Sequence, residues 1–191
     1  MKNQAIQNDG KIFLSDQLQW LTIFAGFSTR GGKSIYNIDT NLEKNNFENK
    51  KREFRIHIKN LLSKYGKKYI DKTAISDDAH IENIELFIIE AKTGYESILV
   101  DGEIRFGIGQ KLLNLYLKYL WVSDDKMNFT PPHCPFDSQV AHELNSDYKF
   151  TISNSKEDYR LIVKKAKIVS DSNIAEWELK LWNKKNVQNK K

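Results

Sequence analysis

All three prolines of this 191-residue chain lie within five positions, between Pro131 and Pro135. Proline interrupts helices and central strands, so the rest of the chain is free to form long regular elements. Only nine residues are glycine. Over residues 46–66 and 81–99, apolar side chains recur at spacings of three and four, which indicates amphipathic helices. We therefore predict an all-α fold of six to seven helices.

The length fits one domain, and 40% hydrophobic residues are enough to form a core. We predict a single helical domain over residues 1–191, with residues 1–15 and 184–191 poorly ordered. Asp77 or Asp78 is expected to cap the helix that begins there, and Ser155 to cap a basic helix through Ile168. Residues 112–121 are apolar on most sides, so we expect that helix at the centre of the core. Short strands near residues 148–153 stay an option.

The composition limits the partners and the compartment. The net charge of +5 and the pI of about 9.1 fit a polyanionic partner, or simply a lysine-rich surface. Cys134 is the only cysteine, so an intramolecular disulfide and a cysteine-ligated metal centre are excluded. No apolar run has the length of a signal peptide or a membrane span. We expect a cytoplasmic monomer without a metal, a cofactor or a membrane partner.

The most informative motif is the run from Gly107 to Lys111, with the sequence Gly-Ile-Gly-Gln-Lys. Residues 106–109 are predicted to form a tight turn between two helices, so the compact domain would contain a helix–hairpin–helix. Free amides at the start of the second helix would favour an anion. A tight connection between two core helices is the simpler interpretation. Lys111 would lie in the first turn of an apolar helix, where burial and the helix dipole both lower a lysine pKa and favour a nucleophilic amine.

Asp137 follows Lys111 by 26 positions (137 − 111) and comes directly after the proline-containing loop. A loop stiffened by proline holds the next residue in one place. Aspartate at this position also predicts an N-cap for a short helix beginning at Ser138. A capping role and a chemical role are compatible, because capping fixes the carboxylate.

These residues resemble the helix–hairpin–helix DNA glycosylases, especially their 8-oxoguanine branches. That family presents its catalytic lysine in a Gly-x-Gly-x-Lys hairpin, with an aspartate after a further helix and loop. The resemblance covers residues 104–144, with a looser likeness at residues 174–182. Phe106 replaces a usual hairpin proline, and the lysine-to-aspartate spacing is longer than in most members.

The resemblance implies an enzyme that extrudes a damaged or modified nucleotide from double-stranded DNA and excises its base. Lys111 would attack the sugar C1′, Asp137 would stabilise the developing positive charge, and strand cleavage by β-elimination could follow. The expected DNA contacts are Arg105, Gly107, Gly109, Gln110, Arg30 and Lys33. The expected base-pocket residues are His133, Gln139, Trp177 and Trp182.

Two alternatives stay open. The chain could be a non-enzymatic helical module that binds nucleic acid or a protein, with Lys111 contacting phosphate and Asp137 only capping a helix. It could also be a Mg²⁺-dependent nuclease, because Asp77-Asp78 followed by Glu90-Ala91-Lys92 imitates the acidic pattern of restriction-type nucleases. The nuclease interpretation requires a strand at residues 84–90.

Overall fold

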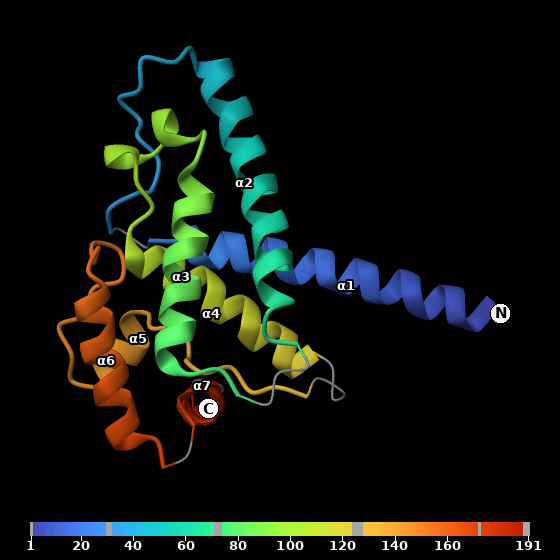
Figure 1. Cartoon of the computed structure of the whole chain (residues 1–191), viewed down its shortest axis with the longest axis vertical. Coiled ribbons are helices and arrows are strands. Elements are labelled where there is room, and N and C mark those ends of the chain that lie inside the picture. Colours follow the sequence, from blue (N-terminus) through green and yellow to red (C-terminus); the bar gives the residue numbers. More distant parts are fainter. Residues whose placement is uncertain (1, 30–31, 71–73, 124–127, 172, 189–191) are drawn as a thin grey trace.

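A computed structural model describes residues 2–29, 32–70, 74–123, 128–171 and 173–188. Within these residues the fold is all-helical, which confirms the predicted class (Figure 1). The α-helices are α1 (Lys2–Phe27), α2 (Lys44–Gly66), α3 (Asp77–Lys92), α4 (Phe106–Ser123), α5 (Ser138–Glu143), α6 (Lys156–Val169) and α7 (Ile174–Gln188). Two 3₁₀-helices, η1 (Glu96–Ile98) and η2 (Val100–Gly102), separate α3 from α4. No described residue belongs to a strand, and residues 148–153 form turns.

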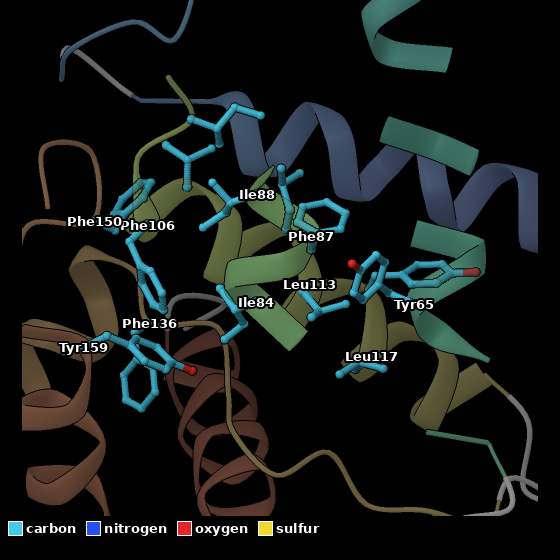
Figure 2. Close-up of a cluster of buried hydrophobic side chains, with 14 of the residues drawn as sticks. Tyr65, Ile84, Phe87, Ile88, Phe106, Leu113, Leu117, Phe136, Phe150 and Tyr159 are labelled. Atoms are coloured by element: carbon cyan, nitrogen blue, oxygen red, sulfur yellow. The ribbon is translucent and has the colours of Figure 1, made fainter. Parts of the chain in front are cut away.

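Helix α4 lies at the centre, as its apolar sequence predicts. Helices α1, α2, α3 and α6 all contact it, and most of its residues are buried. Figure 2 shows Leu113 and Leu117 of α4 among side chains of α2 and α3, with Phe106 near Tyr159 of α6. Burying each large apolar side chain contributes roughly 1.5–3 kcal/mol, so this shared interior fixes the helices around α4.

Glycines allow neighbouring segments to approach α4 closely. A Cβ added to Gly26 of α1 would lie 2.4 Å from a Leu112 side-chain carbon, and one added to Gly109 would lie 2.3 Å from Ile88 of α3. Real Cβ contacts are not this short, so a side chain at Gly26 or Gly109 would force Leu112 or Ile88 to move. A Cβ at Gly107 would lie 2.1 Å from the Phe150 carbonyl oxygen, which belongs to the backbone. The Gly-x-Gly pair of α4 therefore has a packing function.

Several predicted element boundaries are wrong. Helix α1 begins at Lys2, so residues 2–15, which were expected to be poorly ordered, are helical. The cap of α3 is Ser76, whose side chain accepts from the Ala79 amide, and the two aspartates expected as caps lie in the first turn. Residues 106–109, expected to form a turn, are already helical because α4 begins at Phe106. The caps at Ser155 and Asp137 are confirmed.

No helix among the described residues is long and apolar enough to cross a membrane.

Candidate active site in a lysine-containing cleft

A cleft of about 840 Å³ lies beside α4 and is bordered by the end of α1, the start of α5, residues 148–151 and α7. Its lining includes four of the predicted site residues, Lys111, Asp137, Gln139 and Trp182. It also includes an unpredicted ion pair, Lys118 and Glu178. The two predicted catalytic residues therefore share one concave site.

Lys111 lies in the cleft wall with only 9% of its surface exposed. Its ammonium nitrogen is 4.3 Å from the centre of the Phe150 ring. Because α4 begins at Phe106, Lys111 lies in the second helical turn rather than in the first. The helix dipole acts mainly on the terminal turn, so its effect on Lys111 is weaker than the sequence suggests.

Asp137 is held at the cleft by its capping function. Its Oδ1 accepts hydrogen bonds from the amides of Gln139 (3.0 Å) and Val140 (3.2 Å) at the start of α5. Both cap bonds use the same oxygen. The carboxylate is thus fixed in place while its other oxygen takes no part in the cap.

Two polar residues of α4 position the loop that leads to Asp137. Gln110 donates to the Phe136 carbonyl at 2.7 Å and accepts from the Phe136 amide at 3.2 Å. Asn114, one turn further along α4, donates to the Cys134 carbonyl at 3.0 Å. Gln110 is completely buried, so its predicted contact with DNA is wrong for this conformation. Gln110 and Asn114 are polar residues four positions apart on an otherwise apolar helix, and this spacing could have predicted that they position the loop.

The start of α4 offers no free amide to an anion. Phe106 N donates to the Asn154 side chain, Gly107 N donates to the Ser153 carbonyl, and Gly109 N donates to the Arg105 carbonyl. Gly107 and Gly109 are also buried. The predicted phosphate contact through these two glycines is therefore wrong, and the amides instead join α4 to the segment before α6.

The other predicted DNA-contacting residues lie elsewhere. Arg105 is 7% exposed and donates to the carbonyls of Lys33 and Ser34, so its guanidinium supports a loop. Lys33 is exposed and forms an ion pair with Asp101 at 3.1 Å. Arg30 lies outside the described residues.

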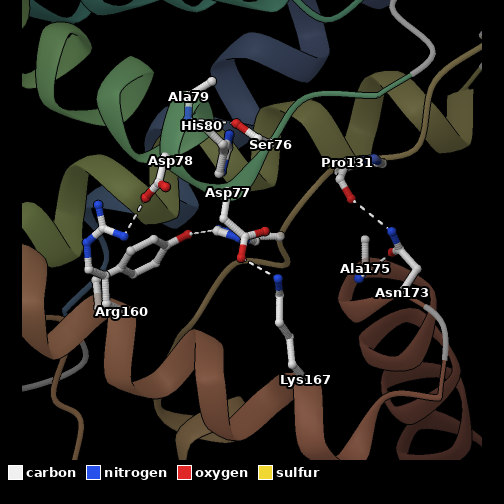
Figure 3. A network of polar contacts seen from close by, with 12 residues as sticks. Ser76, Asp77, Asp78, Ala79, His80, Pro131, Arg160, Lys167, Asn173 and Ala175 are labelled. Atoms are coloured by element: carbon white, nitrogen blue, oxygen red, sulfur yellow. Dashed lines mark hydrogen bonds and ion pairs between the residues drawn. The ribbon is translucent and has the colours of Figure 1, made fainter.

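Two predicted base-pocket residues, His133 and Trp177, do not line the cleft. Trp177 packs partly buried against the core. His133 is completely buried, with Nδ1 2.8 Å from the Tyr159 hydroxyl and Nε2 3.3 Å from Asp77 Oδ1. Figure 3 shows Asp77 also paired with Lys167 of α6. The sequence around His133 does not show whether this side chain lies in a buried hydrogen-bond network or in a pocket.

Lys118 and Glu178 are the cleft residues that the sequence analysis missed. The Lys118 ammonium donates to both Glu178 oxygens, at 2.9 and 2.7 Å, and lies 5.7 Å from the centre of the Trp182 ring. Burial raises the pKa of Glu178, and Lys118 opposes that shift. Lys118 follows Lys111 by seven residues (118 − 111), so both lie on one face of α4. This spacing could have predicted Lys118 as a residue of the same site.

The nuclease alternative loses its structural basis. Residues 84–90, which it requires as a strand, belong to helix α3. Glu90 instead pairs with Lys64 at 2.6 Å and accepts from the Tyr65 hydroxyl. Among the residues that the structure describes, no group of three or more acidic, histidine or cysteine side chains is arranged to hold a metal ion.

Comparisons with protein-family models, curated proteins and solved structures found no match.

Proposed function

We propose that the cleft is the active site of a DNA glycosylase with associated lyase activity, in which Lys111 is the nucleophile. The observation that carries this proposal is that Lys111 and Asp137, which come from different elements, line the same cleft. The cleft volume of about 840 Å³ lies within the usual range for small-molecule sites and is sufficient for one extruded nucleotide. The resemblance to the helix–hairpin–helix glycosylases supports this function only through Lys111 and Asp137, because residues 106–109 are helical and do not form the hairpin turn.

In the proposed reaction, the unprotonated Lys111 amine attacks C1′ of an extruded nucleotide. The C1′–N bond breaks, its electron pair leaves with the base, and a proton lost from the attacking nitrogen passes to the departing base. Asp137 stabilises the positive charge that develops on the sugar. The ring then opens as O4′ takes up a proton from solvent, which gives a protonated Schiff base on Lys111. Loss of a C2′ proton allows β-elimination, in which the electron pair of the C3′–O bond leaves with the 3′ phosphate.

Two further side chains of the cleft suit an extruded base. Trp182 is about half exposed at the cleft, so its ring is accessible for stacking. Gln139 is exposed there and carries both a donor and an acceptor for a base edge. Double-stranded DNA with one damaged or modified base is the proposed partner.

A second candidate is a non-catalytic cleft that binds nucleic acid. The contact between the Lys111 ammonium and the Phe150 ring favours it, because a cation–π contact stabilises the charged form of an amine. In this candidate Lys111 contacts an anion, and Asp137 only caps α5.

Borohydride trapping on a panel of abasic and damaged duplexes tests the proposal. Wild-type protein is expected to give a covalent protein–DNA adduct that Lys111→Ala abolishes. Lys149→Ala is the matched control, because Lys149 is an exposed lysine of the same cleft and should trap normally. If wild type traps no duplex, and Lys111→Ala binds DNA with only a smaller salt dependence, the second candidate replaces the first.

A further inference from the structure

The N-terminal half of α1 extends beyond α2, away from the other helices (Figure 1). One face of this helix carries Gly10, Phe13, Gln17, Leu21 and Phe24, and we call it the outer face of α1. Their spacings of three and four place them in a single stripe. All five residues are exposed, and Phe13, Leu21 and Phe24 have 66, 52 and 60% of their surface open.

The opposite face of α1 is the one that packs on the domain. Gln19, Thr22 and Ile23 are buried there. Trp20 and Asp16, at the border of the two faces, are covered by Lys59 of α2. The outer face is therefore left without a partner by the fold, although it carries three large apolar side chains. A contiguous exposed apolar surface of this kind marks an interaction site.

The outer face has a symmetric arrangement about Gln17. Phe13 and Leu21 are each four residues from Gln17, and Gly10 and Phe24 are each seven residues from it. Two antiparallel copies related by a two-fold axis at Gln17 would therefore place every residue opposite a residue of this same set. Self-complementarity of this kind is what an isologous interface requires.

We infer that the outer face of α1 binds a second copy of this chain, as an antiparallel helix pair centred on Gln17. Gly10 is opposite Phe24 of the partner, and no heavy atom lies within 4 Å of the position where a Gly10 Cβ would be. This open position leaves room for the large Phe24 ring. Phe13 meets Leu21 of the partner, and the Gln17 amide, which has both donors and an acceptor, can pair with its own symmetry mate.

This pairing also accounts for Gly10 itself. Glycine inside a helix costs roughly 0.5–1 kcal/mol relative to alanine, so an exposed glycine there is unfavourable unless its missing side chain is used. The inference therefore proposes a homodimer, whereas the sequence led us to expect a monomer. Because Phe24 also lines the cleft, the dimer interface borders the proposed active site, although the inference does not depend on what the cleft does.

Disulfide cross-linking of Gln17→Cys tests the antiparallel geometry. Residue 17 lies on the proposed axis, so oxidation should give a covalent dimer in high yield. The native Cys134 is completely buried and does not compete. Ile12→Cys is the matched control, since Ile12 is 70% exposed but lies off the outer face, and it should stay monomeric. Phe13→Cys, which lies opposite Leu21 in the antiparallel pair, should also cross-link poorly. Equal yields at positions 13 and 17 would indicate parallel pairing, equal yields at position 12 as well would indicate random collision, and either result would overturn the inference.

Sedimentation of two non-covalent variants provides an independent test. Gly10→Leu should shift the dimer to monomer because it fills the position of Phe24, although it favours the helix. Leu21→Glu should have the same effect. Both positions are exposed, so helix content by circular dichroism should match wild type. A wild-type chain that sediments as a monomer and does not cross-link through Gln17→Cys would overturn the inference.

Discussion

Glu178 of α7 holds the Lys118 ammonium of α4 with both carboxylate oxygens, in the wall of the cleft. The two side chains are only 7 and 10% exposed. Charges at such depth are costly unless they stay paired. The pair therefore joins α7 to the central helix and keeps Trp182 at the cleft.

Removing one partner of this pair should be more damaging than removing both. We expect Glu178→Leu and Lys118→Met each to lower the free energy of unfolding by about 3–5 kcal/mol, because each leaves a buried charge unpaired. The double variant should lose much less than the sum. Urea denaturation measures all three, and Lys33→Met, which breaks an exposed ion pair, should change stability by less than about 1 kcal/mol. Additive single effects would contradict this energetic coupling.

Alanine should have opposite effects at two glycines. A Cβ at Gly107 would lie 2.1 Å from the Phe150 carbonyl oxygen, a backbone atom that cannot rotate away. Gly107→Ala should therefore destabilise the fold by about 1–3 kcal/mol or more. In the monomer, Gly10→Ala should stabilise the fold by roughly 0.5–1 kcal/mol, because the position is helical and no heavy atom of the same chain lies within 4 Å of the added Cβ. Thermal unfolding compares the two, and equal melting temperatures would refute the close approach at Gly107.

The buried histidines should make stability depend on pH. Burial lowers the pKa of His80, and the neighbouring His133 adds to that shift. Burial also lowers the pKa of His133, although Asp77 opposes it. In the unfolded chain histidines titrate near pH 6.5, so below about that pH the unfolded state binds more protons. Their stabilising contribution is complete above about pH 6.5 and is lost as the pH falls.

Urea denaturation between pH 8 and pH 5 measures this effect. The free energy of unfolding should fall by up to about 1.4 kcal/mol per pH unit for each histidine below about pH 6.5. His133→Gln should make the dependence shallower. His142→Gln should not, because the His142 side chain is 86% exposed. A stability that is constant from pH 7 to pH 5 would contradict neutral, buried histidines.

Asp137 variants separate its capping function from its proposed chemistry. Asp137→Asn keeps a side-chain acceptor for the α5 amides but removes the charge. It should therefore retain stability and lose most base-excision activity. Asp137→Ala should lose activity and also about 1 kcal/mol of stability, because the cap is gone. Single-turnover base release and thermal unfolding give the two readouts, and an active Asp137→Asn would remove Asp137 from the chemistry.

The sequence predicts the helices better than their contacts. Apolar spacing places α2 and the body of α4, and the side-chain chemistry of Asp137 and Ser155 predicts their caps. The helix predicted over residues 81–99 is too long, because α3 ends at Lys92 and the two 3₁₀-helices η1 and η2 follow it. Helix α1 is missed at its N-terminal end because Gln, Asn and Asp are frequent there and interrupt the apolar spacing of the sequence. The turn predicted at residues 106–109 is wrong because glycine usually interrupts helices, whereas here Gly107 and Gly109 are required by close packing.

Only some of the cleft residues could be predicted from the sequence. Lys111 and Asp137 stand out through their local motifs, but the direction of a polar side chain depends on tertiary contacts. Gln110 points to the loop before Asp137 and is buried there, while His133 enters a network with Tyr159. Glu178 becomes a cleft residue only because α7 folds back on Lys118, which lies 60 residues earlier (178 − 118).

Lys111 is the residue on which the enzymatic proposal depends, and mass spectrometry of the trapped complex identifies the bonded residue directly. After borohydride reduction, nuclease treatment and proteolysis, tandem spectra should place the sugar remnant on Lys111 alone. The Lys111→Ala chain should give no modified peptide, while Lys149→Ala should give the wild-type pattern. A remnant on Lys118, Lys149 or any other amine, or no remnant from any damaged duplex, would contradict Lys111 as the nucleophile.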